Sequence, residues 1–208
     1  MILPEIGQPV SFLQKILYFD YWLFIKINQE WISPFFDRVF LFLREPDIWI
    51  PFYLFLLVFV TLNFARRGLW WASFLGLTAI LSDQISSNLM KRLVFRLRPC
   101  QDPQWVESIR VLAKYCPISS SFTSSHACNH FALATFLFLT LGITSRWWAL
   151  AFVWAFLISY AQVYVGVHYP GDVFSGALLG CGIGYFTSRL FLKLFGSFPL
   201  PTYNHGHA

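Results

Sequence analysis

The sequence predicts an all-α protein, a polytopic transmembrane helical bundle of five to six spans that follows N-terminal interfacial helices. Of the 208 residues, 57% are hydrophobic and only 12% are charged, whereas a soluble domain carries about a quarter charged residues. Several apolar stretches approach the roughly 20 residues that a helix needs to cross a bilayer. The length leaves room for one domain.

Five stretches are apolar and long enough, or nearly so, to be spans: residues 48–65, 69–90, 125–144, 147–167 and 172–191. The segments before residue 46 are also apolar, but charged residues and Pro34 interrupt them, so amphipathic interfacial helices are expected there. Residues 11–29 are an alternative first span, which would bring the number of spans to six. The chain therefore divides into an N-terminal region (1–46), a transmembrane core (47–195) and a flexible tail (196–208), whose His205 and His207 are expected to be solvated.

The formal net charge of +5 fits anionic lipid headgroups or phosphate-bearing substrates and does not choose between them. Nucleic acid is not expected as a partner, because the cations lie beside apolar spans rather than along one exposed face. The start of the chain lacks a basic region and a small-residue cleavage site, so no removable signal peptide is expected.

Three polar clusters lie at the ends of the apolar segments. The first contains Lys91 and Arg98, the second begins the third stretch, and the third joins the fourth stretch to the fifth. Counting spans places all three clusters on one side of the membrane, as a single site requires. Lys91 and Arg98 are seven residues apart, which predicts that they lie on the same face of a helix, two turns from each other. Together they could clamp a phosphate, although snorkelling cations at a helix end are the simpler alternative.

Ser124, Ser125 and His126 begin the third stretch. Free backbone N–H groups make a helix start an anion site, and serine there is also an ordinary N-cap. His126 could protonate a leaving oxygen. His130 follows one turn later, but a zinc site needs a third ligand, and the sequence offers no convincing one, so no metal is expected.

His168 and Asp172 form the third cluster, and Tyr169-Pro170-Gly171 lies between them. Pro170 and Gly171 are expected to break the helix, which places Asp172 in the first turn of the fifth stretch. A carboxylate bonded to one imidazole nitrogen raises the basicity of the other, and this is how a histidine becomes a nucleophile. A structural hydrogen bond at the membrane edge is the alternative.

Together the clusters resemble the signature of the type-2 phosphatidic acid phosphatase superfamily, which is written K-x6-RP, PSGH and SR-x5-H-x3-D. The first part is intact here, the second has Thr123 and Ser125 where Pro and Gly are usual, and the third has Ala161-Gln162 where Ser-Arg is usual. The resemblance implies a membrane enzyme that removes phosphate from a lipid phosphate through a phosphohistidine, without a metal or other cofactor.

The resemblance also implies a role for each matching residue. His168 would be the nucleophile, Asp172 would orient it, and His126 would be the general acid. The phosphate-binding residues would be Lys91, Arg98, Ser124, Ser125 and Gln162.

Gln162 is the main departure from the signature, because glutamine carries no charge where arginine is usual. Losing a charge-assisted contact could cost on the order of a hundredfold in rate, and Arg92 or Arg96 could compensate. A phosphotransferase and a non-hydrolytic polyprenyl-phosphate carrier or flippase are the alternatives. The candidate substrates are phosphatidic acid, phosphatidylglycerol phosphate, undecaprenyl diphosphate and the phosphates of lipid A.

Orientation follows from the charges on the side opposite the clusters, which are Arg66, Arg67, Arg146, Arg189 and Lys193. The positive-inside rule makes that side cytoplasmic, so the site is expected to face the periplasm or exterior from a bacterial inner membrane. On the site's side, Cys100 and Cys116 could form a disulfide in an oxidising compartment, or remain two free thiols.

Two further features concern packing. Gly176, Gly180 and Gly184 recur every fourth residue and predict a smooth stripe where another helix approaches closely. Asp83 interrupts the second stretch and shares a face with Ser87 and Lys91. It is expected to make an interhelical hydrogen bond, with a pairing to a basic residue as the alternative.

Overall fold

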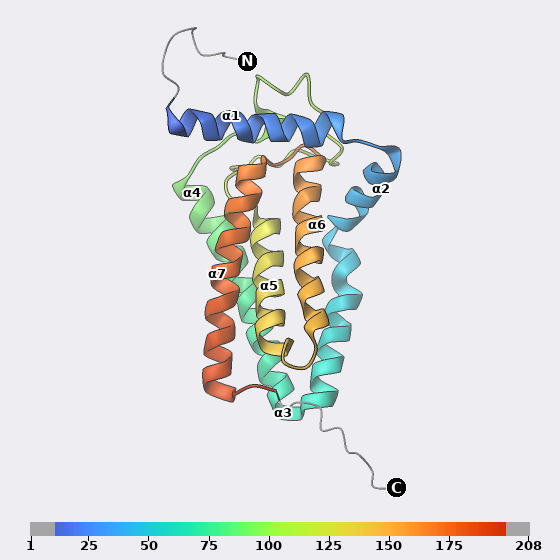
Figure 1. The fold of residues 1–208 in the computed structure, drawn as a ribbon, viewed down its shortest axis with the longest axis vertical. Coiled ribbons are helices and arrows are strands. Elements are labelled where there is room, and N and C mark those ends of the chain that lie inside the picture. Colours follow the sequence, from blue (N-terminus) through green and yellow to red (C-terminus); the bar gives the residue numbers. More distant parts are fainter. Residues whose placement is uncertain (1–10, 199–208) are drawn as a thin grey trace.

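A computed structural model describes residues 11–198, and these residues are helical with irregular connections and without strands. Figure 1 shows an upright bundle formed by α3, α5, α6 and α7, with α1 lying across one end. The all-helical architecture predicted from composition is therefore confirmed. The loop that joins α4 to α5 lies at the same end as α1.

The N-terminal region forms α1 (Phe12–Ile25), a π-helical turn (Lys26–Glu30) and α2 (Pro34–Leu43). Serine caps begin both helices: the Ser11 hydroxyl accepts from the N–H of Gln14, and the Ser33 hydroxyl accepts from the N–H of Phe36. Such caps satisfy backbone donors that have no partner within the helix. With 14 residues, α1 is shorter than the roughly 20 that a span requires.

A long helix, α3 (Ile50–Asp83), follows a 3-10 turn at Pro46–Trp49 and folds back on itself. The reversal occurs at Ala65, whose φ of 46° lies in the left-handed region. Gly68 permits the tight approach, because a Cβ there would lie 2.2 Å from the carbonyl oxygen of Val60. The two arms of α3 correspond to the stretches predicted at 48–65 and 69–90, and the second arm continues as a π-helix (Gln84–Met90) and α4 (Lys91–Leu93).

The remaining helices are α5 (Ser125–Leu141), α6 (Leu150–Tyr164) and α7 (Pro170–Phe195), with short 3-10 turns at Pro99–Gln101 and Arg146–Ala149. Helix α5 is the centre of the bundle and packs against α3, α6 and α7. The helix is interrupted before Asp172, which lies in the first turn of α7 as expected, but Pro170 and Gly171 do not make the break: α6 already ends at Tyr164, and Pro170 is the first residue of α7. Proline has no N–H to lose at that position, so it begins a helix readily.

Small residues bring α5 and α7 into contact. A Cβ on Gly176, Gly180 or Gly184 would lie within 2.5 Å of a backbone oxygen of α5 or of its N-cap residue Ser124. The predicted glycine stripe is therefore confirmed as the closest packing surface that these two helices share.

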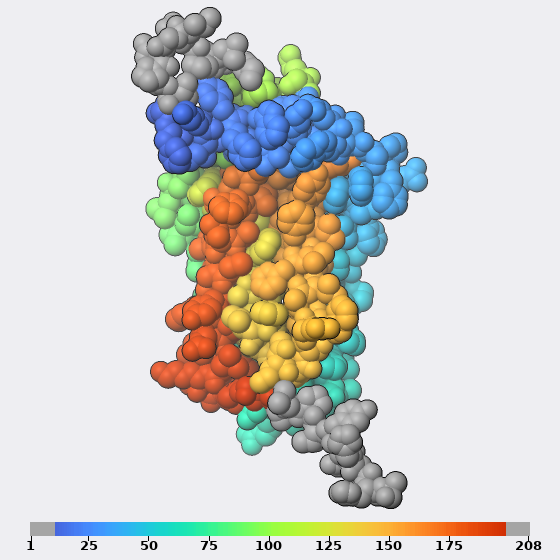
Figure 2. Space-filling model, in the orientation of Figure 1, coloured from blue at the N-terminus to red at the C-terminus, as the bar shows by residue number. Residues whose placement is uncertain are grey.

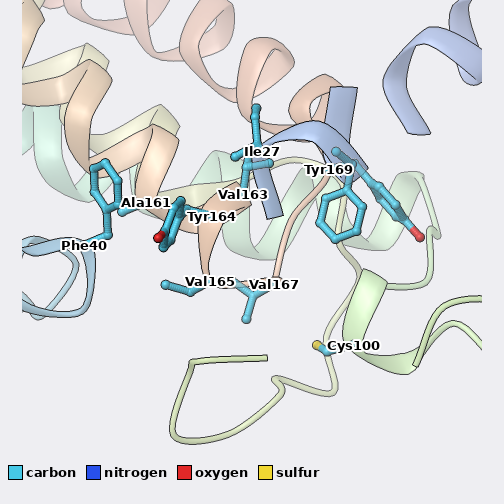
Figure 3. Close-up of a cluster of buried hydrophobic side chains, with 10 residues drawn as sticks. Ile27, Phe40, Cys100, Ala161, Val163, Tyr164, Val165, Val167 and Tyr169 are labelled. Atoms are coloured by element: carbon cyan, nitrogen blue, oxygen red, sulfur yellow. The ribbon is translucent and has the colours of Figure 1, made fainter. Parts of the chain in front are cut away.

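A buried apolar cluster fastens the N-terminal region to the end of the bundle. It includes Ile27 and Phe40 from that region, Tyr164 at the end of α6, and Val167 and Tyr169 in the α6–α7 connection. Figure 3 shows these side chains, with Phe40 and Tyr164 side by side and with Val167 the labelled residue nearest to Cys100 of the α4–α5 loop. Figure 2 shows α1 covering this end of the molecule.

Three helices among the described residues are long and apolar enough to cross a membrane: Pro46–Leu93, Arg146–Tyr164 and Pro170–Phe195. The first includes both arms of α3. Many large apolar side chains on these helices are exposed, among them Leu62, Phe174 and Phe186. Such a surface is suited to lipid.

Replacing Gly180 with alanine is predicted to destabilise the bundle. The new Cβ would lie 2.2 Å from the carbonyl oxygen of Cys128, so α5 and α7 must separate. Overpacking of this kind costs about 1–3 kcal/mol. The measurement is the thermal unfolding midpoint in detergent, with Gly182→Ala as the matched control, since a Cβ on Gly182 meets nothing within 4 Å. Equal midpoints for the two variants would contradict the close packing.

Candidate active site

The sequence clusters converge on one cavity of about 720 Å³ at the end of the bundle near the α4–α5 loop. Its polar end holds cations, histidines and amides, whereas its other end runs between apolar side chains of α3 and α5. The polar lining residues are Arg44, Asp83, Ser87, Lys91, Arg98, Ser119, Ser125, His126, Asn129, His130, Gln162 and His168. The apolar lining residues include Tyr53, Leu57, Trp71, Leu75 and Leu133.

Lys91 and Arg98 both line the cavity, but the expectation that they share a helix face is wrong. Helix α4 ends at Leu93, and Val94 is extended. Arg98 is extended as well, with φ −76° and ψ 153°, as is usual for a residue before proline. The two cations reach the same cavity because the chain leaves the helix between them.

Arg98 is buried and held in place by several acceptors. Its guanidinium donates to the carbonyl oxygens of Ser119 (2.9 Å) and Val167 (3.0 Å), and its Nη1 lies 2.9 Å from Nε2 of His168. Burial lowers the pKa of Arg98 to about 10, which still leaves it charged at neutral pH. A fixed cation therefore touches the nitrogen that is expected to be nucleophilic.

The tautomer of His168 follows from this contact. Since arginine can only donate, Nε2 of His168 accepts and the ring proton of the neutral form lies on Nδ1. Nδ1 lies 3.4 Å from the Ser121 hydroxyl and 3.7 Å from Oδ2 of Asp172. Burial lowers the pKa of His168 to about 4, although Asp172 opposes the shift. The imidazole is therefore neutral at pH 7, as a nucleophile must be.

Asp172 is fully buried and receives donors from three residues in two segments, the α4–α5 loop and the α6–α7 connection. Ser121 donates its hydroxyl proton to Oδ2, the Tyr169 N–H donates to the same oxygen at 3.0 Å, and Arg96 donates to Oδ1 at 2.8 Å. Arg96 also binds Asp20 of α1 at 2.6 Å. Burial opposes the charge of Arg96, but the two carboxylates outweigh it and raise the pKa of this guanidinium.

The start of α5 supplies His126 and Ser125 to the cavity. The Ser125 hydroxyl lies 2.9 Å from that of Ser87, and the His126 ring makes no hydrogen bond with any residue from 11 to 198. Ser124 is different: it is buried, it caps α5 by accepting from the N–H of Ala127 at 3.4 Å, and it does not line the cavity. The Ser124 hydroxyl is therefore an ordinary N-cap, which was the alternative to an anion-binding role.

Comparison with known proteins identifies the family. The family model of the PAP2 superfamily matches residues 68–195. The chain belongs to this superfamily. The resemblance found in the three motifs is thereby confirmed. The protein is a membrane lipid phosphatase of the PAP2 type.

Individual relatives give the extent of the similarity. The chain is 33% identical to the lipid A 4′-phosphatase of Bacteroides thetaiotaomicron over 177 residues, which is 81% of this chain and 77% of that protein. It is 32% identical to the undecaprenyl-diphosphatase of Sulfolobus acidocaldarius over 149 residues, 69% and 63% of the two chains. Among solved structures, Aquifex aeolicus LpxE superposes with a TM-score of 0.63 at 27% identity, covering 81% of this chain and 94% of that one.

In this PAP2 protein Gln162 lines the cavity but is nearly fully buried, and its amide donates to the carbonyl oxygen of Ile158 at 3.5 Å. The expectation that Arg92 or Arg96 compensates for its neutrality is not met, because neither lines the cavity. Arg96 is instead bound to the carboxylates of Asp20 and Asp172.

Two other expectations concern polar residues near the site. The Asp83 carboxylate accepts from Ser87 at 3.0 Å and from Asn129 of α5 at 3.4 Å, which is the interhelical bond expected. The His130 ring lies 2.8 Å from the carbonyl oxygen of His126 and packs on Trp154. No group of three potential metal ligands occurs within residues 11–198.

The α4–α5 loop is closed by a disulfide between Cys100 and Cys116. This places the covalent link within the loop that carries Arg98 and the serines around it. Of the two cysteines expected in the core, Cys128 is buried and Cys181 is partly buried.

Sequence reasoning missed Asp20 and Ser121 as parts of the site. Asp20 is one of the charged residues that interrupt the apolar N-terminal segment, and its position there does not indicate a partner. It accepts from the backbone N–H of Gly171 at 2.6 Å as well as from Arg96. Ser121 lies in a run of three serines that gave no local signal.

Replacing Ser121 with alanine is predicted to lower kcat about 10- to 100-fold, since a hydrogen bond to a charged group contributes about 1.5–3 kcal/mol. The Ser121 hydroxyl lies between Nδ1 of His168 and Asp172, so its loss should act only through that pair. The Ser121→Ala/Asp172→Asn double variant should therefore be no slower than Asp172→Asn. Ser108→Ala, an exposed serine of the same loop, is the control. Multiplicative losses in the double variant would argue against the shared role.

Proposed function

We propose that this protein hydrolyses a lipid phosphate without a metal, with His168 as nucleophile, Asp172 as its orienting carboxylate and His126 as general acid. Lys91, Arg98 and Ser125 bind the phosphate. The observation that carries the proposal is the shape of the cavity: basic and imidazole groups meet at one end, and the same cavity continues between apolar side chains. A phosphate joined to a lipid chain has this polarity.

The reaction proceeds in two displacements. Nε2 of His168 attacks phosphorus, the bond from phosphorus to the lipid oxygen breaks, and that oxygen takes a proton from His126. Water then attacks the phosphohistidine and gives its proton to His126, which releases inorganic phosphate and restores both histidines. The negative charge of the bound phosphate favours the protonated form of His126 that the first displacement needs.

Arg98 also controls when His168 is reactive. In the free site Nε2 accepts a hydrogen bond from Arg98, so its lone pair is occupied. Phosphate oxygens are stronger acceptors for a guanidinium than an imidazole nitrogen is. Binding of the substrate therefore frees Nε2 while Arg98 turns to the transferring phosphoryl group.

The proposed substrate class is a phosphate monoester on a glycolipid of the lipid A kind. The support is similarity to lipid A 4′-phosphatases, at 33% identity over 177 residues in one and 28% over 116 residues in another. Undecaprenyl diphosphate is the second candidate, supported by the 32% identity to an undecaprenyl-diphosphatase.

We further propose five crossings, made by the two arms of α3 and by α5, α6 and α7, with α1 in the interface at the site's end. The disulfide of Cys100 and Cys116 supports an oxidising compartment on that side, such as the periplasm. Arg66 and Arg67 lie at the fold-back of α3, and Arg146 lies in the turn before α6. Both turns are at the end of the bundle opposite the site, in accord with the positive-inside rule. A bacterial inner membrane with an outward-facing site satisfies both observations.

Phosphate release by the purified protein in detergent tests the proposed reaction. Lipid A, undecaprenyl diphosphate, phosphatidic acid and phosphatidylglycerol phosphate are compared with EDTA present. Release is expected to survive EDTA, to favour lipid A and to vanish in His168→Ala. With a phosphorus-labelled substrate and rapid acid-free quenching, acid-labile label should appear on the wild-type protein during turnover and should be absent from His168→Ala. Binding of lipid without release from any of the four would favour the carrier, and transfer only to an added lipid alcohol would favour the phosphotransferase.

The apolar part of the cavity is predicted to hold one lipid chain. Gly76 lines it, and a Cβ there would meet nothing within 4 Å, so Gly76→Leu can fill the channel without displacing the backbone. Hydrolysis of long-chain substrate should fall at least tenfold in kcat/KM, because apolar contact along the chain is lost. A short-chain phosphate should be cleaved at the wild-type rate. The control is Gly182→Leu on α7, which also meets open space but lies outside the cavity.

A further inference from the structure

Arg44 brings a third cation to the cavity. It follows α2 as the C-cap residue and lies outside the segment that matches the superfamily, residues 68–195. Its side chain lines the cavity that also contains Lys91, Arg98 and His168. The permanent charges of the lining are thus three cations against one carboxylate, that of Asp83.

The three cations differ in their partners. Arg98 is held by Ser119, Val167 and His168, as described above. Within residues 11–198, neither the Arg44 guanidinium nor the Lys91 ammonium has a hydrogen bond or an ion pair. The nearest acidic residue in sequence, Glu45, is paired with Lys114 at 3.4 Å.

Electrostatic repulsion between the cations of the cavity destabilises the protein when no ligand is bound. Burial lowers the pKa of Arg44. Burial is the main cause that lowers the pKa of Arg98, and the positive charge of Arg44 lowers it further. The two guanidiniums are therefore close enough to repel each other. Like charges facing a partly desolvated cavity destabilise the free protein, and a bound dianion removes the repulsion while gaining attraction from each cation.

Asp83 does not neutralise the excess. Its carboxylate is satisfied by Ser87 and Asn129, and no basic residue among those described pairs with it. Gln162, which lines the same cavity, offers an amide that is engaged with Ile158 and carries no charge. The uncommitted cationic donors of the cavity are therefore Arg44 and Lys91.

We propose that Arg44 is a substrate-binding residue whose guanidinium contacts the phosphate oxygens, so that Arg44, Lys91 and Arg98 form a three-cation site. This inference rests on the proposed hydrolysis of a phosphate ester. It gives the N-terminal region a direct part in the site, since α2 delivers one of the three cations. It also predicts that this region cannot be exchanged or removed without loss of phosphate affinity.

Arg44→Gln, Arg44→Lys and the control Arg38→Gln test the proposal in the full chain. Arg38 is exposed on the same helix α2 and lies outside the cavity. The two measurements are kcat/KM for the lipid phosphate and the inhibition constant of inorganic phosphate, which carries no lipid. Arg44→Gln should lower kcat/KM about 10- to 100-fold and weaken inhibition by inorganic phosphate about tenfold or more. Arg44→Lys should recover part of both, and Arg38→Gln should match wild type.

The outcomes separate this inference from the proposed function. If wild type releases phosphate and Arg44→Gln retains the wild-type inhibition constant for inorganic phosphate, Arg44 does not contact the phosphate and the inference is overturned. The same holds if Arg38→Gln weakens inhibition as much as Arg44→Gln, because the effect is then general charge. If wild type releases no phosphate from any lipid, the proposed function fails. In that case the contact can still be tested by binding alone. If a thermal-shift assay shows that inorganic phosphate binds more weakly to Arg44→Gln than to wild type, the contact is supported.

Discussion

The buried carboxylate of Asp172 is the constraint on which the rest of this structure depends. A carboxylate without water must be satisfied by donors, because an unpaired buried charge costs several kcal/mol. Here the donors come from separate parts of the chain: Ser121 and Arg96 from the α4–α5 loop, and the Tyr169 N–H from the α6–α7 connection. The loop and the start of α7 are therefore held in one arrangement by the carboxylate that is proposed to orient His168.

The same network reaches α1. Arg96 connects Asp172 to Asp20, and Asp20 accepts the N–H of Gly171 in the first turn of α7. A helix that lies across the end of the bundle (Figure 1) is thus bonded to the segment that carries the proposed nucleophile. The apolar contacts of Phe24 and Tyr21 with the Tyr169 ring support the same position. Packing and ion pairing at this end serve one purpose, which is to fix the α6–α7 connection.

Much of this could be predicted from the sequence, because apolar length and motif spacing are local properties. The bundle, the glycine stripe and the meeting of the three clusters all follow from such local patterns. What could not be predicted depends on tertiary contact. The fold-back of α3 places Ala65, a residue other than glycine, at a positive φ. Lys91 and Arg98 do not share a helix, because α4 ends at Leu93 and the chain from Val94 onward is extended. The partners of Asp20 are distant by 76 and 151 residues, so no local pattern reveals them.

The α4–α5 loop shows how such distant contacts are kept in place. Its two ends bond to each other, since the Ser121 N–H donates to the carbonyl oxygen of Arg96 at 2.8 Å and the Arg96 N–H donates to Ser120 at 3.1 Å. Between these ends the disulfide joins Cys100 to Cys116, 16 residues apart. A loop of about that length gains roughly 3 kcal/mol from such a link through the reduced entropy of the unfolded chain. Fixing a loop in advance matters here because Arg98 must lie against His168 before any substrate arrives, and an ordered loop makes that contact without a further entropic cost on binding.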